Sequence, residues 1–199
     1  MNIFLASASP RRLELLRQVG VEPIIWPSSF AEETRHFGDP VAYAREYAEM
    51  KALGALPLPT PGVCVAADTV VHFRGHLLGK PETPEHAAWM LQLLSGQSHE
   101  VVTGVAVAES VTRFLVSHAC TRVEFRELSP AEISRYVATG EPIDKAGGYA
   151  IQGAAAVFVR CIEGCYSNVV GLPLSLLYHM LQDFGVDLTG MRGSAGDNS

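Results

Sequence analysis

The sequence predicts an α/β protein built on a mixed, twisted sheet with flanking helices. Stretches typical of strands mix with stretches typical of helices along the chain, and no repeat or low-complexity linker divides it. Consecutive β runs within 63–73 and 101–125 favour antiparallel hairpins over the strict alternation of a doubly wound fold. With 199 residues, 48% of them hydrophobic and 18% charged, the chain can bury a large core. We expect one domain over residues 1–189 and a disordered tail over 190–199.

The first half of the chain predicts strands and helices in succession. An apolar run over residues 2–6 predicts a strand, and Ser9-Pro10 then supplies an N-cap and a proline at the first helical position. Apolar residues at helical spacing continue to Gly20, which ends this helix. The remaining elements of this half are a strand over 21–26, a helix over 41–53, a proline-rich loop over 56–62 and a buried strand over 63–73.

The second half predicts further strands and three helices. Arg74-Gly75-His76 is typical of a hairpin turn. Ser129 and Glu132 form a capping box that begins a helix, Gly140 ends that helix, and a loop rich in glycine and charge follows. The remaining elements are helices over 83–96 and 173–184 and strands over 101–108, 114–125 and 154–162.

The composition restricts the possible partners and compartments. Fifteen Lys and Arg against 21 Asp and Glu give a net charge of −6, which disfavours a nucleic-acid partner. The four cysteines show no structural zinc spacing, so we expect buried, reduced thiols. No apolar stretch is long enough to span a bilayer, and the N-terminus has the reverse order of a secretory signal. We therefore expect a cytoplasmic protein without a membrane partner.

The segment from Leu5 to Arg12 is the first candidate site. Small residues follow a predicted strand, and Arg11 and Arg12 fall on the opening turn of the predicted helix. Free backbone N–H groups, the positive end of the helix dipole and two guanidinium groups favour one bound phosphate. The alternative is that Ser9 only caps the helix and that both arginines are solvated.

A carboxylate, Asp68, interrupts the apolar strand over 63–73. Burial of an aspartate without a partner is costly. Asp68 therefore either reaches a cleft, where it can bind a divalent metal or take a proton from water, or forms a structural salt bridge. Glu32 and Glu33 could add metal ligands, since magnesium prefers carboxylate oxygens, or could be solvated surface.

Three lysines and a glycine-rich segment form the third candidate set. Lys51 follows the apolar side of a predicted helix, and Lys80 lies between Gly79 and a proline. Lys145 belongs to the segment from Asp144 to Gly153. Gln152 in this segment offers an amide that could read a base edge. The alternative is a glycine-rich turn between a helix and a strand. No G-x-S-x-G or Walker-type sequence occurs, which argues against a serine hydrolase and a P-loop kinase. If the site is real, its chemistry therefore depends on carboxylates and lysines.

Together these motifs resemble the Maf-type nucleoside triphosphate pyrophosphatases, also called septum formation inhibitor proteins. The match covers nearly the whole chain. It rests on Leu5–Arg12, Ala67–Val71, Gly79–Pro81, Leu94–Gly96 with His99, Thr103–Val105, Asp144–Gly147, Ile151–Gly153 and Val169–Leu174. The resemblance implies an elongated, two-lobed α/β fold similar to that of inosine triphosphate pyrophosphatases. It also implies a site in the cleft between the lobes and a homodimer.

The resemblance further implies hydrolysis of nucleoside triphosphates to the monophosphate and pyrophosphate, with magnesium or manganese. Arg11, Thr69 and Gln152 match the branch that resembles dTTP/UTP pyrophosphatases, whereas the branch that acts on 7-methyl-GTP differs there. Ala150 departs from the glycine that is usual in the family and could narrow the loop beside Gln152. The alternatives are another triphosphate substrate, such as 7-methyl-GTP or a modified pyrimidine nucleotide, or a non-catalytic nucleotide-binding regulator of septum formation.

The resemblance implies roles for individual residues as well. Asp68 is the expected proton acceptor, Glu33 is expected beside it at the metal, and Lys51 is the third expected catalytic residue. The residues expected to bind substrate are Ser7, Arg11, Arg12, Thr69, Lys80 and Gln152.

Overall fold

The computed structural model describes residues 1–30 and 38–188, and these residues form one seven-stranded mixed sheet. The strand order is β2–β1–β3–β5–β6–β7, and β4 also pairs with β3. β1 runs parallel to β2 and β3, whereas β3, β5, β6 and β7 are antiparallel in succession. The strands are β1 (Asn2–Leu5), β2 (Ile24–Ile25), β3 (Gly62–Phe73), β4 (His76–Leu78), β5 (Ser98–Ser110), β6 (Arg113–Phe125) and β7 (Val159–Glu163). The predicted mixed sheet is confirmed.

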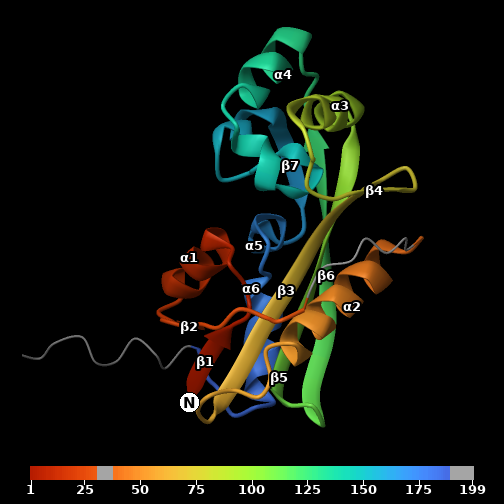
Figure 1. The fold of residues 1–199 in the computed structure, drawn as a ribbon. Coiled ribbons are helices and arrows are strands. Elements are labelled where there is room, and N and C mark those ends of the chain that lie inside the picture. Colours follow the sequence, from red (N-terminus) through yellow and green to blue (C-terminus); the bar gives the residue numbers. More distant parts are fainter. Residues whose placement is uncertain (31–37, 189–199) are drawn as a thin grey trace, which may run out of the picture.

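Helices cover both faces of this sheet and divide the molecule into two lobes (Figure 1). The long strands β3, β5 and β6 run through both lobes, so the molecule is elongated. Helix α2 packs across β3 and β5 on one face, and α6 packs on β5 and β6. The lower lobe in Figure 1 holds α1 (Pro10–Gln18), α2 (Pro40–Leu53) and α6 (Leu174–Gln182). The upper lobe holds α3 (Pro84–Leu94), α4 (Pro130–Val137) and the short 3-10 helices η1 (Glu141–Asp144), η2 (Ala146–Gly148) and η3 (Ala154–Phe158), and α5 (Tyr166–Val170) lies between the lobes.

The alternation of β3 assigns its side chains to the two faces of the sheet. Val63, Val65 and Ala67 join the core beneath α6. Cys64 and Ala66 instead join a core of small residues beneath α2. Because successive side chains of a strand point to opposite faces, the next two residues of β3 also separate. Asp68 faces α2, and Thr69 faces α5.

One edge of β3 is open in its middle. β1 pairs with residues 62–65 of this edge, and β4 pairs with residues 71–73. Among residues 1–30 and 38–188, no strand pairs with the edge between these two stretches. Asp68 and Thr69 lie in this gap, between the lobes, where a ligand can reach both faces of the sheet. Chain segments that leave β1 and β4 border the gap on either side.

Helix α2 lies close to the sheet because the residues between them are small. Ala48 of α2 belongs to the same core cluster as Ala66 and Ala106 of the sheet. At Gly104 the helix and the sheet are so close that an added Cβ would overlap the backbone of Ala44. A larger residue at position 104 would therefore push α2 away from β3 and β5.

Several predictions of local structure are wrong. The strand expected over 21–26 contains only Ile24 and Ile25, because Pro23 and Pro27 flank it and cannot donate to a strand partner. Residues 154–158 form a 3-10 helix rather than a strand, and α5 was not expected. Ser9 occupies the N-cap of α1 without a side-chain cap bond. The hydroxyl of Ser7 instead accepts the Ser9 N–H at 3.2 Å.

Other local predictions are confirmed. The hairpin at Arg74-Gly75 joins β3 to β4. The capping box is complete, since Ser129 Oγ accepts the Glu132 N–H at 3.3 Å and Glu132 Oε2 accepts the Ser129 N–H at 2.9 Å. These two signals are local, so the sequence alone determines them.

The cysteines agree with the expectation only in part. Cys64 is buried, and burial raises the pKa of its thiol to about 12. Cys120 and Cys161 are exposed, so the expectation of buried thiols is wrong for them. Cys161 lies on the edge strand β7, and Cys120 lies on β6 outside the stretch 122–125 that pairs with β7.

No helix within residues 1–30 and 38–188 combines the length and the apolar character needed to cross a membrane. The tail expected over 190–199 lies outside the described residues.

Candidate active site

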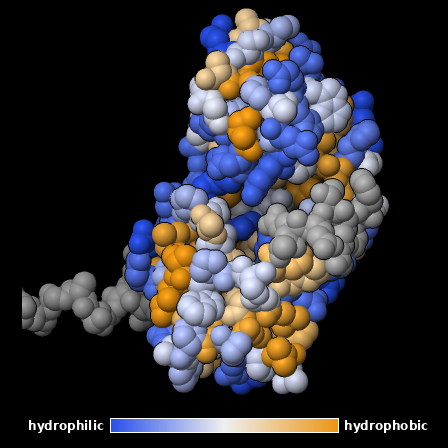
Figure 2. All heavy atoms as spheres, in the orientation of Figure 1, coloured by the Kyte–Doolittle hydropathy of each residue, from blue (hydrophilic) through white to orange (hydrophobic). Residues whose placement is uncertain are grey.

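The residues that the sequence predicts for the site meet in one cavity at the gap in β3. The cavity has a volume of about 720 Å³ and lies between the lobes. Figure 2 shows hydrophilic side chains gathered at this waist of the molecule. The predicted residues that line it are Ser7, Arg11, Arg12, Lys51, Asp68, Thr69, Lys80 and Gln152. The remaining predicted residue, Glu33, lies outside the described residues.

Asp68 and Lys51 form an ion pair on the α2 face of the gap. Lys51 Nζ lies 2.5 Å from Asp68 Oδ1, and each side chain is only 13% exposed. Lys51 belongs to the last turn of α2, so the close packing of this helix on the sheet sets the distance. Asp68 thus reaches the cleft and also forms a salt bridge, the two alternatives that its sequence context left open.

Arg12 is fixed by acceptors on three sides. Its Nε donates to the Gly171 carbonyl at 2.8 Å, Nη1 to Ser7 Oγ at 3.1 Å and Nη2 to Thr69 Oγ1 at 3.2 Å. Gly171 permits this approach through a left-handed backbone, with φ of 123°. The alternative of a merely solvated Arg12 is therefore wrong. Its guanidinium is held in one orientation at the start of α1, where the helix dipole also favours an anion.

Arg11 lies half-buried beside it and lines the same cavity. Burial lowers the pKa of its guanidinium, and the nearby carboxylate of Asp144 opposes this change. Its Nε is buried and has no hydrogen-bond partner within the described part of the chain. A buried donor without a partner is unfavourable, so a ligand oxygen at this position would stabilise it.

Two loops of the upper lobe form the opposite wall. The Gly147 N–H donates to the Gly79 carbonyl at 3.0 Å, which joins the loop after β4 to the loop after η1. Lys80 and Lys145 therefore line one wall together, and Lys145 forms an ion pair with Asp144. Cations from both lobes surround the cavity, an arrangement suited to a ligand with several negative charges.

The loop that carries Gln152 is held by a chain of hydrogen bonds. The Ala150 N–H donates to the Tyr136 hydroxyl at 3.1 Å, and this hydroxyl donates to Glu141 Oε1 at 2.8 Å. Glu141 Oε2 accepts the Ala154 N–H at 3.2 Å. Ala150 has no positive φ, so its backbone conformation accommodates the methyl group without strain.

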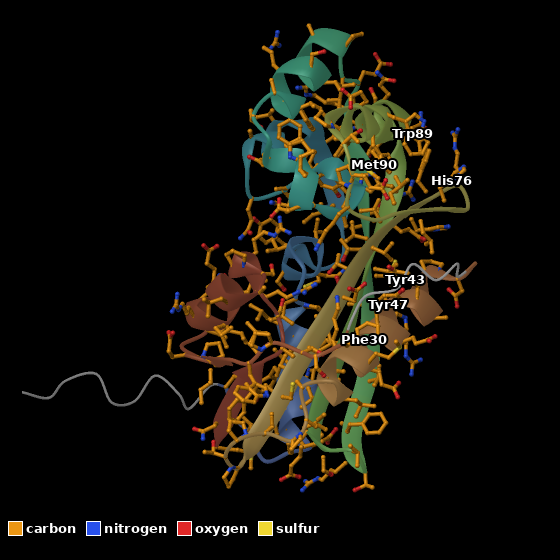
Figure 3. All side chains as sticks on the ribbon, in the orientation of Figure 1. Phe30, Tyr43, Tyr47, His76, Trp89 and Met90 are labelled. Atoms are coloured by element: carbon orange, nitrogen blue, oxygen red, sulfur yellow. The ribbon has the colours of Figure 1, made fainter. Side chains whose placement is uncertain are left out.

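Sequence reasoning missed an aromatic wall of the cavity. Tyr43 and Tyr47 stack with ring centroids 4.4 Å apart, and Phe30 meets Tyr47 edge-on at 5.9 Å. Figure 3 shows these three rings in a row along α2. The signal was present, because Tyr43, Tyr47 and Lys51 are spaced by four residues and share one side of the helix.

The fold and the site define a two-lobed α/β protein with a cation-lined cleft suited to a nucleoside polyphosphate. The chain belongs to the family described as Maf-like protein, whose model matches residues 2–184.

Relatives and a solved structure agree with this assignment. The dTTP/UTP pyrophosphatase of Desulforamulus reducens is 46% identical over 187 residues, which cover 94% of this chain and 98% of the relative. The dTTP/UTP pyrophosphatase of Moorella thermoacetica is 48% identical over 190 residues, which cover 95% of this chain and 98% of the relative. The structure of a HAM1 protein from Coxiella burnetii matches with a TM-score of 0.51 at 19% identity, covering 92% of this chain and 99% of that one. This last likeness concerns the fold alone and confirms the expected architecture.

Proposed function

We propose that this chain hydrolyses nucleoside triphosphates to the monophosphate and pyrophosphate, with dTTP and UTP as its substrates. The observation that carries the proposal is the meeting of the Asp68–Lys51 pair with cations from both lobes at the gap in β3. Relatives named dTTP/UTP pyrophosphatase, at 46–48% identity over nearly the whole chain, support it.

The proposed reaction begins with a water molecule at Asp68. The Asp68 carboxylate accepts a proton from this water while the water oxygen forms a bond to the α-phosphorus. The bond from the α-phosphorus to the oxygen that bridges to the β-phosphate breaks, and pyrophosphate leaves with the electron pair. Lys51, 2.5 Å from Asp68, holds the carboxylate in place and adds positive charge where the phosphate becomes more negative.

The other cations bind the phosphates in this proposal. Arg12 is preorganised by three acceptors, so it loses little freedom when it binds an anion. Ser7 lies beside it on the segment that leaves β1, and Lys80 lies on the segment that leaves β4. A triphosphate in the gap thus meets groups from both lobes and holds the lobes together.

A divalent cation, magnesium or manganese, belongs to the proposal. Within the part of the chain that the structure describes, no three His, Cys, Asp or Glu side chains form a metal cluster. One carboxylate in a phosphate-binding cleft nevertheless fits magnesium, which proteins often hold through one or two carboxylates while phosphates and water complete the shell. Asp68 would hold the cation, together with Glu33, which lies outside the described residues. The cation would neutralise charge on the phosphate oxygens.

Base selection in the proposal takes place on the other face of β3. Thr69 faces α5, and Arg11 and Gln152 line the cavity with it. The Gln152 amide offers both a donor and an acceptor, which suits the edge of a uracil or thymine ring. The homodimer, the cytoplasmic location and the absence of nucleic-acid and membrane partners stay predictions.

Hydrolysis of dTTP in water enriched in oxygen-18 tests the proposed reaction. Attack at the α-phosphorus places the label in dTMP and leaves the pyrophosphate unlabelled. Label in pyrophosphate, or release of inorganic phosphate with dTDP, would contradict the proposal.

A further inference from the structure

A chain of hydrogen bonds links the cleft to the interior of the protein. Arg12 Nη2 donates to Thr69 Oγ1 at 3.2 Å, and Thr69 Oγ1 lies 2.9 Å from Thr103 Oγ1. Thr103 Oγ1 in turn donates to the Asn168 carbonyl at 3.1 Å. The four groups come from α1, β3, β5 and α5, so the chain joins all the elements around this face of the gap.

The inner end of this chain is firmly anchored. Thr103 and Asn168 are both fully buried. The Asn168 side-chain amide donates to the Val101 carbonyl at 2.9 Å and to Thr121 Oγ1 at 3.0 Å. Thr69, in contrast, is only partly buried and lines the cavity. Thr69 is therefore positioned by Thr103 and Asn168, which no ligand can reach.

The two ends of the chain determine the direction of every bond in it. A guanidinium can only donate, and a carbonyl oxygen can only accept. Because the Asn168 carbonyl accepts, the single hydrogen of the Thr103 hydroxyl points to it. The Thr69 hydroxyl must then donate its own hydrogen to Thr103, since two hydroxyl oxygens 2.9 Å apart without a hydrogen between them would repel.

This direction limits what Thr69 can offer to a ligand. Its hydrogen is committed to Thr103, and one lone pair accepts from Arg12. A hydroxyl oxygen has two lone pairs, so one acceptor site is left. Thr69 can therefore accept a hydrogen bond from a molecule in the cleft but cannot donate one.

We propose that Thr103 is a positioning residue for substrate selection, because it holds the Thr69 hydroxyl as an acceptor and so favours a nucleotide that presents an N–H or O–H group there. This inference rests on the proposed pyrophosphatase function. Two groups of a pyrimidine nucleotide have this chemistry: the imide N–H of uracil or thymine, and a hydroxyl of the sugar. A nucleotide with an acceptor in the same place meets a second acceptor and is disfavoured.

Paired substrates separate the two sources of the donor. UTP carries the imide N–H, whereas CTP has an acceptor nitrogen at the same ring position. dTTP carries a sugar hydroxyl, whereas 3′-O-methyl-dTTP has an ether oxygen in its place. The measurement is kcat/KM for each member of the two pairs, by release of pyrophosphate.

Thr103→Val keeps the shape of the side chain but removes its hydroxyl. The Thr69 hydrogen then becomes available to an acceptor in the cleft. We expect the preference for the donor substrate to fall about tenfold in one pair, in line with the contribution of one hydrogen bond. A fall in the UTP/CTP ratio assigns the donor to the base, and a fall in the dTTP/3′-O-methyl-dTTP ratio assigns it to the sugar. Unchanged ratios in both pairs overturn the inference.

Control variants distinguish positioning from a general structural effect. Thr103→Ser restores the hydroxyl and should restore the wild-type ratios. Thr121→Val removes a buried hydroxyl that contacts Asn168 but not Thr69, so both ratios should stay at their wild-type values. In a Thr69→Val background, Thr103→Val should shift the ratios no further, since it acts only through Thr69. A further shift in that background would contradict the assigned role.

Two further results keep the test decisive. If Thr103→Val fails to fold, Thr69→Val serves in its place, because it removes the acceptor itself. Thr69→Val should lower the UTP/CTP or the dTTP/3′-O-methyl-dTTP ratio of kcat/KM, and unchanged ratios then overturn the inference. If the wild-type protein hydrolyses neither dTTP nor UTP, the proposed function fails. Turnover by the wild type with unaltered ratios in the variants removes only the role of Thr103.

Discussion

Asp68 on β3 and Gly104 on β5 are direct partners in the register of the sheet. Because Gly104 has no side chain, the backbone of α2 at Ala44 lies directly against the sheet at this position. The same helix carries Lys51 to within 2.5 Å of Asp68. The geometry of this ion pair thus depends on a glycine that contributes no side chain to it.

Replacement of Gly104 by alanine should disturb both stability and activity. The added methyl group would overlap the backbone of α2, and overpacking of this kind destabilises a core by about 1–3 kcal/mol. The shift of α2 should also lower kcat by about tenfold, because Lys51 moves away from Asp68. Urea unfolding and steady-state kinetics measure the two effects. Gly79→Ala, whose added methyl group meets open space, should leave stability unchanged. Wild-type stability and kcat in Gly104→Ala would refute this account.

Replacement of Arg12 by lysine should weaken substrate binding. The Arg12 guanidinium donates to three acceptors at once, and an ammonium group on a flexible stem cannot reproduce this planar arrangement. We expect KM for dTTP to rise about tenfold or more, with a smaller change in kcat. Titration of the initial rate against dTTP gives both constants. A KM equal to that of the wild type would show that the orientation of Arg12 is unimportant.

Replacement of Gln152 by glutamate should reduce the use of pyrimidine nucleotides. The change keeps the length of the side chain but converts an amide donor into an acceptor with a negative charge. We expect kcat/KM for dTTP and UTP to fall at least tenfold. Purine triphosphates assayed beside them show whether the loss is specific for the base. Unaltered dTTP and UTP kinetics would remove Gln152 from base recognition.

His99 should make the stability of the protein depend on pH. Burial lowers the pKa of His99 from near 6.5 to about 4, and its Nε2 lies 2.8 Å from the Tyr149 hydroxyl. The folded state keeps His99 neutral, whereas the unfolded state binds a proton below pH 6.5. This contribution to stability is therefore present above pH 6.5 and is lost as the pH falls toward 4. It amounts to about 2.5 kcal/mol between pH 7 and pH 4.5.

Urea unfolding of the wild type and of His99→Gln at these two pH values tests this expectation. The wild type should lose more stability than the variant by about this amount, because glutamine does not titrate. Equal losses in the two proteins would mean that His99 does not distinguish the folded state from the unfolded state.

The fold was predictable from sequence where the determining signals are local. The capping box at Ser129 and the hairpin at Gly75 involve residues a few positions apart, and both are confirmed. The helix α5 was not predictable, because its five residues are too few for a period and its Asn168 is anchored by Val101 and Thr121, which are distant in the sequence.

The residues of the candidate site were predictable, but their arrangement was not. An aspartate inside an apolar strand is unusual enough that the sequence alone singles out Asp68. The gap at this point of β3 depends on where β1 ends and β4 begins, and only the sheet register shows it. Alternation along β3 separates Asp68 from Thr69, but only the fold shows that Lys51 of α2 lies at Asp68 and that Arg12 of α1 lies at Thr69. The sequence therefore indicated the members of the site without separating those near Lys51 from those near Arg12.

The measurement that tests the central claim most directly compares the wild type with Asp68→Asn. Both proteins are assayed for pyrophosphate and monophosphate with magnesium or manganese, against dTTP, UTP, 7-methyl-GTP and the other nucleoside triphosphates. We expect the wild type to convert dTTP and UTP to the monophosphate and pyrophosphate. Asp68→Asn should keep its fold, judged by circular dichroism, and should lose at least about a hundredfold in kcat, because the amide cannot accept a proton. An unchanged kcat in the folded variant, or no turnover of any nucleotide by the folded wild type, would contradict the account.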